Sequence, residues 1–203
     1  VKGISISSPI PRMSYQEAMD RYGSDKPDTR VGMEIADVTR HVAASEFRVF
    51  VDTVNAGGVV RGINVKGGAS FTRRQIDSLS EKAQSFGAKG LMWLALEEDK
   101  VRSPIAKFLQ ASELEGITGE LGGEVGDLLL LVAGGYDLVC DVLGRLRLTL
   151  GKELDLIDED LYNLLWVVDW PLLVYDEEEG RYMAAHHPFT APLDEDVDLL
   201  ETD

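Results

Sequence analysis

The sequence is poor in the features that mark secreted and membrane proteins. Its 203 residues include one cysteine, Cys140, which excludes an internal disulfide framework and a zinc site built from several cysteines. No apolar run approaches the roughly 20 residues that a helix needs to cross a bilayer. The first residues lack the basic stretch followed by an apolar one that is typical of a signal peptide. We therefore expect a cytoplasmic protein with no membrane partner.

Positive charge is also scarce. The chain has 20 lysines and arginines against 36 aspartates and glutamates, a formal net charge of −16. Residues 152–203 hold 16 acidic residues and two basic ones, so −14 of this charge lies in the C-terminal part. Phosphate binding needs a basic surface, so we do not expect the chain alone to bind nucleic acid. We interpret the acidic end as a solvated surface.

Apolar residues make up 44% of the sequence and charged residues 28%, as in a soluble globular protein of one or two domains. In the first half, caps, turns and apolar spacing predict a helix in 12–23 capped by Ser14, a loop at 23–30, a hairpin of 47–51 and 59–65, and a helix at 72–86. Further along, they predict a strand at 91–96, helices from Ser103-Pro104 into 105–109 and at 112–121, a strand at 127–133, a helix at 136–150, and two antiparallel strands at 164–175 and 181–185.

This mixture predicts an α+β fold, a mostly antiparallel sheet covered by helices that pack on one of its faces. Residues 37–150 hold most of the predicted core, and we interpret them as one domain. The ends, 1–36 and 151–203, do not complete a core by themselves. That organisation is typical of a domain inserted into another domain.

Six motifs follow one another along the chain: YGSDKPDTR at 22–30, GGASFTRRQID at 67–77, GAKGL at 87–91, SPIAKFL at 103–109, LWVVDWP at 165–171 and HHPFTA at 186–191. In this order and spacing they resemble the middle part of the bacterial-type aspartyl-tRNA synthetases. The resemblance implies that 37–150 is the insertion (GAD) domain of that family, a module similar to one in a subunit of the tRNA-dependent amidotransferase. It implies that 1–36 and 151–203 are flanking parts of the class II catalytic domain.

The resemblance also implies an activity. The family activates aspartate with ATP and Mg²⁺ and then esterifies tRNA with it. The arginine motifs that hold ATP in this family are absent from these 203 residues, so we expect the fragment to be inactive alone and to bind no cofactor. The resemblance implies a homodimeric parent enzyme, whereas we expect the fragment to be a monomer. It leaves open whether the parent also charges asparagine tRNA.

His186 and His187 are the residues that we associate with aspartate. The resemblance implies this role, and it is chemically reasonable. An imidazole, with an ordinary pKa near 6.5, becomes cationic beside the side-chain carboxylate of aspartate, which favours aspartate over asparagine. From the residues alone, two structural histidines in a proline-fixed turn are the plainer interpretation. With the resemblance we assign His186 to substrate, while His187 either joins it or orients the loop. Adjacent histidines on a strand point apart, which disfavours a metal site.

Two charged groups complete the candidates. Asp25, Lys26, Asp28 and Arg30 are a possible network at the mouth of the catalytic pocket, or a loop held by its own ion pairs. Lys66, Arg73, Arg74 and Lys89 are possible contacts with the tRNA acceptor arm. The two arginines follow a glycine-rich turn at 67–70 that can hold an anion, although such a turn is more often only a tight connection. No arrangement predicts a catalytic group or a metal site.

A second class of function stays open at this level. A free-standing relative of the insertion domain would be a non-catalytic binding module that contacts tRNA or protein. Such a module has no reason to keep the motifs at 22–30 and 186–190, so the sequence favours the enzyme fragment.

Overall fold

The computed structural model describes residues 8–176, 179–185 and 191–199. The chain divides into two units, one formed by residues 1–17 and 164–203 and the other by residues 18–163. The division falls inside helix α1 (Tyr15–Tyr22). Ser14 caps this helix as the sequence predicts, since its Oγ accepts a hydrogen bond from the backbone N–H of Glu17 at 3.1 Å. The domain boundaries at 36/37 and 150/151 stay a prediction.

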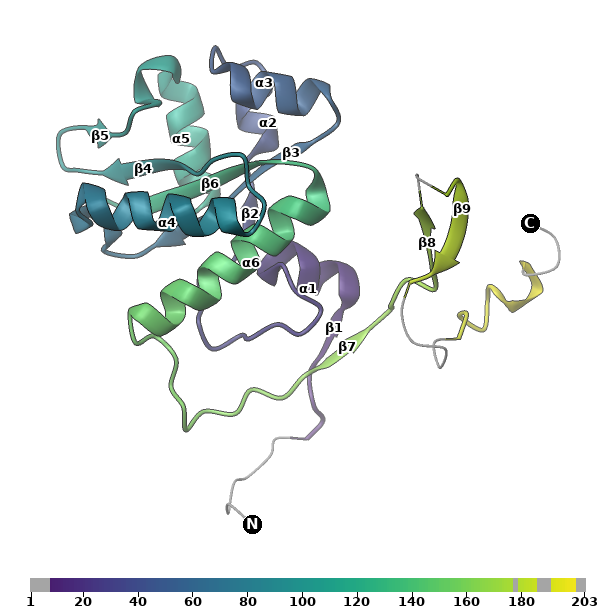
Figure 1. The fold of residues 1–203 in the computed structure, drawn as a ribbon. Coiled ribbons are helices and arrows are strands. Elements are labelled where there is room, and N and C mark those ends of the chain that lie inside the picture. Colours follow the sequence, from purple (N-terminus) through teal and green to yellow (C-terminus); the bar gives the residue numbers. More distant parts are fainter. Residues whose placement is uncertain (1–7, 177–178, 186–190, 200–203) are drawn as a thin grey trace. The chain divides into compact units, whose positions relative to one another are not determined.

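A five-stranded sheet forms the centre of the larger unit (Figure 1). Its strands lie in the order β2 (Ala36–Asp37), β3 (Val59–Val65), β6 (Leu128–Gly134), β4 (Met92–Leu96) and β5 (Val101–Arg102), and each pairing is antiparallel. The residues of β6 from Leu128 to Val132 are all 0% exposed. A continuous apolar strand of this kind needs cover on both faces of the sheet.

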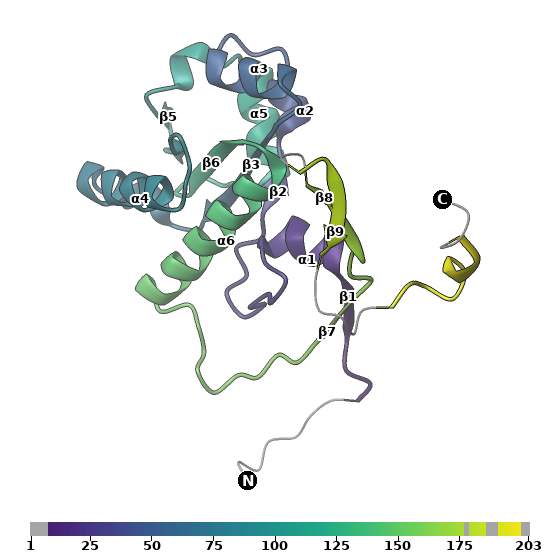
Figure 2. The same cartoon turned by 45° about the vertical axis from the view of Figure 1, so that its right-hand side comes forward.

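Helices supply that cover on both sides (Figures 1 and 2). Helices α4 (Arg73–Ser85) and α6 (Tyr136–Glu153) pack on one face, and α2 (Thr39–Val42), α3 (Arg48–Asn55) and α5 (Ala111–Glu120) pack on the other. The two faces of the sheet thus belong to two separate apolar clusters. The predicted α+β class with a mostly antiparallel sheet is confirmed, but the expectation that helices cover only one face is wrong.

Local sequence explains where several elements begin. Thr72 caps α4 in a capping box, because Thr72 Oγ1 accepts from the backbone N–H of Gln75 and the Gln75 side chain accepts from the backbone N–H of Thr72. Before it, Gly67 adopts a φ of 71°, a left-handed conformation that suits glycine, and the turn η1 (Gly68–Ser70) follows. The predicted elements at 72–86, 91–96, 112–121, 127–133 and 136–150 are all present.

Two local predictions in the larger unit are wrong. Residues 47–51 are not the first strand of a hairpin, because α3 begins at Arg48. The valine-rich run imitates a strand, yet Phe47, Phe50, Val51 and Val54 have the spacing of one helix face, and Phe50 is fully buried. The helix expected after Ser103-Pro104 is a single turn, η2 (Ala106–Phe108), because Leu109 leaves it in an extended conformation and α5 begins two residues later.

The smaller unit contains two short sheets. β1 (Arg12–Ser14) pairs in parallel with β7 (Trp166–Val168), and the Tyr15 and Trp170 rings lie 5.3 Å apart beside them. β8 (Leu173–Asp176) and β9 (Arg181–Ala184) form an antiparallel pair around the acidic turn, as predicted. The single strand expected over 164–175 is wrong, because this range is divided into β7 and β8. The turn η3 (Val197–Leu199) follows. Within the ranges that the structure describes, none of the helices is both long and apolar enough to cross a bilayer.

Candidate functional site

Helix α6 holds the segment that contains the YGSDKPDTR motif. Arg147, on this helix, is 1% exposed. Its Nη2 donates to the main-chain carbonyl of Asp28 at 2.9 Å, and its Nε donates to that of Met33 at 3.2 Å. The guanidinium lies 4.9 Å from the centre of the Tyr22 ring. Burial lowers the pKa of Arg147, but a guanidinium remains protonated, so a buried positive charge faces residues 28–33.

Asp28 and Arg30 form a two-point ion pair on the segment. Arg30 Nε donates to Asp28 Oδ1 at 2.9 Å and Arg30 Nη2 to Asp28 Oδ2 at 2.7 Å. The backbone N–H of Arg30 donates to the same carboxylate at 3.0 Å. The hydrogen bonds from Arg30 lower the pKa of Asp28 and raise that of Arg30. Both side chains are about one quarter exposed, so the pair lies at the surface with its geometry fixed.

Arg30 also reaches the chain that leaves α6. Its Nη1 donates to the carbonyls of Asp158 and Leu161 at 3.3 and 3.4 Å, and Asn163 Nδ2 donates to Thr29 Oγ1 at 3.2 Å. Residues 29–30, which precede the five-stranded sheet, are therefore joined to residues 158–163, which follow α6, within the larger unit.

A second buried arginine holds the start of the same segment. Arg61, on β3, is 4% exposed, and its Nη2 donates to the main-chain carbonyl of Asp20 at 2.9 Å and lies 3.2 Å from Asp20 Oδ1. The Tyr136 hydroxyl donates to the same Oδ1 at 2.8 Å. Arg61 Nη1 lies 3.1 Å from the Sγ of Cys140, a fully buried thiol whose pKa is raised by burial. Cys140 is thus a core residue.

A surface pair links the helix α1 to the far end of the segment. Arg21 Nη2 donates to Glu34 Oε1 at 2.7 Å, and Arg21 Nε donates to Glu34 Oε2 at 2.8 Å. The Tyr22 hydroxyl donates to Glu34 Oε1 at 3.2 Å. The hydrogen bonds from Arg21 lower the pKa of Glu34, whereas burial and the Glu34 charge raise that of Tyr22.

The remaining predicted residues of this loop stand apart from the pair. The Asp25 side chain is half-buried and that of Lys26 is exposed, and within the described ranges neither makes an ion pair. The structure thus brings together Asp28 and Arg30 of the four predicted residues. His186 and His187 lie outside the described residues.

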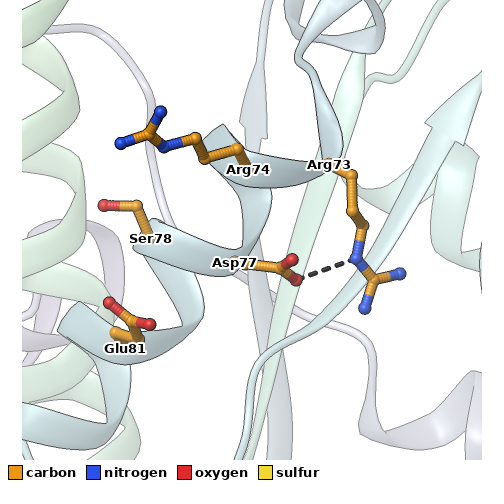
Figure 3. Close-up of a pocket in the computed structure, with 5 residues that line it drawn as sticks. All are labelled: Arg73, Arg74, Asp77, Ser78 and Glu81. Atoms are coloured by element: carbon orange, nitrogen blue, oxygen red, sulfur yellow. Dashed lines mark hydrogen bonds and ion pairs between the residues drawn. The ribbon is translucent and has the colours of Figure 1, made fainter.

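The four predicted tRNA contacts do not form one cluster. Lys66 Nζ lies 2.9 Å from Asp127 Oδ2, and Arg73 Nε lies 2.8 Å from Asp77 Oδ1. Arg74 extends away from Asp77 on the first turn of α4 (Figure 3). An open depression of about 640 Å³ is lined there by Arg73, Arg74, Asp77, Ser78 and Glu81. Lys89 follows the other end of α4, a helix about 20 Å long at 1.5 Å per residue.

Arg74 and Lys89 differ from the other two cations in their electrostatic environment. Both side chains are exposed, and no carboxylate of the described residues pairs with either. Each therefore faces solvent without an ion-pair partner among the described residues. Among the described residues, no group of three or more histidine, cysteine or acidic side chains could hold a metal ion.

Sequence reasoning missed Arg147, Arg61 and Asp127, all of them buried and hydrogen-bonded. A signal was present. Arg147 follows Leu143 by four positions on the apolar face of α6, and Arg61 interrupts the apolar run of β3. A charged residue in such a position is buried only if it has partners, so the position itself indicates hydrogen bonds to other parts of the chain.

Comparison with known proteins agrees with this architecture. Residues 50–143 match the family model of the GAD domain, which covers the stretch from α3 through β6 into α6. This stretch of the larger unit is thus similar to the GAD domain. The longer comparison concerns the whole chain, which is similar along nearly its full length to bacterial aspartate–tRNA ligases, and the resemblance that its motifs predict is confirmed.

Three relatives show the extent of the match. The chain is 58% identical over 201 residues to an aspartate–tRNA ligase of Bacillus licheniformis. It is 57% identical over 203 residues to an aspartate–tRNA(Asp/Asn) ligase of Bacillus cytotoxicus and 56% identical over 199 residues to one of Halothermothrix orenii. These alignments cover 98–100% of this chain but 34% of each relative. The chain thus spans about one third of the length of these curated relatives.

Proposed function

We propose that this chain is the GAD-containing part of a bacterial aspartate–tRNA ligase. On this proposal the whole protein activates aspartate with ATP and Mg²⁺ and transfers it to tRNA in the cytoplasm. The observation that carries the proposal is the 58% identity over 98% of the chain to a relative of that name. Residues 37–150 are the insertion domain, and 1–36 and 151–203 belong to the catalytic domain.

Within this proposal His186 and His187 contact the aspartate side chain. The support is chemical: an imidazole that becomes cationic beside a carboxylate distinguishes aspartate from its amide. Asp28 and Arg30 are the surface pair that would lie at the pocket mouth, since their two-point geometry is already fixed. Asp25 and Lys26 would contribute only charge.

The tRNA contact is proposed for the cations near α4, namely Lys66, Arg73, Arg74 and Lys89. Arg74 and Lys89 are the stronger candidates because neither must first leave a carboxylate. Exposed cations of this kind bind phosphates with a strong dependence on salt. The charge of −16 implies that most of the basic surface for tRNA lies in parts of the ligase beyond these residues.

The similarity is nearly equal for relatives of two tRNA specificities. Relatives named aspartate–tRNA ligase and aspartate–tRNA(Asp/Asn) ligase are 58% and 57% identical to the chain, so this part does not separate the two types.

Aspartate-dependent ATP–pyrophosphate exchange tests the proposal. We expect no exchange by the 203-residue chain, a monomer without the family's ATP-holding motifs, and clear exchange by the homodimeric ligase that contains it. Exchange by neither protein would contradict the enzyme proposal and favour a non-catalytic binding module. Exchange by the short chain would contradict the assignment of the ATP site to other parts of the ligase.

A further inference from the structure

Arg147 uses its buried charge in an unusual way. Buried arginines are normally paired with a carboxylate, because an unpaired buried charge is costly. The hydrogen bonds of Arg147 go instead to two main-chain carbonyls, those of Asp28 and Met33, while the Tyr22 ring lies against the guanidinium. Its planar fork therefore fixes the path of the backbone on both sides of Arg30.

The surface of α6 is shaped to receive this backbone. A Cβ on Gly144 would lie 2.6 Å from the carbonyl oxygen of Gly23, and a Cβ on Gly151 would lie 2.9 Å from the Val31 side chain. Gly144, Arg147 and Gly151 are spaced by three and four residues, so they lie on one face of the helix. The two glycines leave space for residues 23–31 to pack closely on α6, and Arg147, between them in sequence, forms hydrogen bonds to the same segment.

The segment held in this way presents the Asp28–Arg30 pair. Arg147 donates to the main chain of Asp28, and the Asp28 side chain in turn binds the Arg30 side chain and backbone N–H. Arg30 continues the connection to the carbonyls of Asp158 and Leu161. One buried side chain of α6 is therefore linked through hydrogen bonds to the segment before the five-stranded sheet and to the segment that follows α6.

We propose that Arg147 is a positioning residue for aspartate activation: from α6 it holds residues 28–33 in the conformation that presents Asp28 and Arg30 to the substrate pocket. This inference rests on the proposed ligase function. It gives the GAD domain a role in the first half-reaction, beyond contact with tRNA. Arg147 itself touches neither substrate, so its effect is on geometry.

The first test measures the geometry on the 203-residue chain. In Arg147→Met the side chain keeps its apolar volume and loses its donors, so the amides of residues 30–35 should exchange hydrogen about tenfold faster or more. Arg147→Lys keeps the positive charge and one donor nitrogen, so its exchange rates at residues 30–35 should lie between those of Arg147→Met and wild type. Arg145→Met is the matched control, because Arg145 lies on the same helix but is exposed and pairs with Asp141. Amides of β6 report whether the fold is retained.

The second test measures aspartate activation by the full-length ligase. Arg147→Lys should raise the KM for aspartate about fivefold or more, with a change of less than about twofold in the KM for ATP, and Arg145→Met should leave both unchanged. Faster exchange at 30–35 with an unaltered KM for aspartate would overturn the positioning role and leave Arg147 a residue of stability alone. Unaltered exchange in Arg147→Met would overturn the claim that Arg147 holds the segment.

The two proposals fail in different ways. If the wild-type full-length protein does not activate aspartate, the ligase function is wrong and the role of Arg147 in it falls as well. If wild type is active and the Arg147 variants show no larger effect than the Arg145 control, the ligase function stands and the positioning role is wrong.

Discussion

Replacement of Asp127 with asparagine should destabilise the unit formed by residues 18–163, because this carboxylate is 4% exposed and joins three parts of the chain. Its partners are Lys66 Nζ at 2.9 Å and Asn64 Nδ2, Gly67 N and Glu124 N, each at 3.0 Å. These donors come from the end of β3, the turn after it and the loop before β6. An asparagine side chain turns an N–H₂ group toward at least one of them.

The size of the effect follows from the pKa. Burial alone would raise the pKa of Asp127, but the hydrogen bonds from Lys66, Gly67, Asn64 and Glu124 outweigh burial and lower it from 3.8 to about 2. At about 1.36 kcal/mol for each pKa unit, this shift corresponds to about 2.5 kcal/mol in favour of the folded state. Because the folded pKa lies below the unfolded one, this stability is present above pH 3.8 and is lost as the pH falls toward 2.

Urea unfolding followed by far-ultraviolet circular dichroism measures this quantity, since α2 to α6 all lie in residues 18–163. At pH 7, Asp127→Asn should lose about 2–3 kcal/mol of unfolding free energy, and the loss should shrink between pH 4 and pH 2. Asp99→Asn, at an exposed carboxylate, is the control and should change little. A loss below about 0.5 kcal/mol, or a loss that does not depend on pH, would refute the reasoning.

Three further outcomes are expected. Leu130→Ala, in the fully buried strand β6, should cost about 2–5 kcal/mol in urea unfolding, and a cost under about 1 kcal/mol would show that the strand is not central. Gly144→Ala should lower the melting temperature, because its Cβ would meet the Gly23 carbonyl. Gly119→Ala on α5 is the control and should be neutral or stabilising, because its Cβ meets nothing within 4 Å. Equal changes in melting temperature would contradict the close packing on α6. In the proposed full-length ligase, His186→Ala should raise the KM for aspartate more than that for ATP in pyrophosphate exchange, and equal changes would argue against a substrate contact.

Some elements could be predicted because one local cause is sufficient for them. Thr72 and Gln75 satisfy each other at the start of α4, so the capping box determines that helix wherever it packs. The unbroken apolar run of β6 likewise has one stable place, the middle of a covered sheet. Residues 47–51 have the composition of a strand but form the start of α3, because β-branched residues suit both a strand and a buried helix face, and tertiary packing decides between them.

The candidate site could be predicted only in part. Asp28 and Arg30 are close in sequence, so their pairing required no knowledge of the fold. Arg147 lies more than a hundred residues from the carbonyls that it binds, and main-chain acceptors have no sequence signature. The separation of Arg74, in the first turn of α4, from Lys89, beyond its other end, also depends on the fold, because nearness in sequence does not place cations on one surface.

The most direct measurement is the transfer of labelled aspartate to tRNA by the full-length protein that contains this chain. An aspartate–tRNA ligase should give ATP-dependent aspartyl-tRNA in which the label is released by mild alkali, as expected of an ester. Failure to form this product, by a folded protein supplied with ATP, Mg²⁺ and aspartate tRNA, would contradict the assignment.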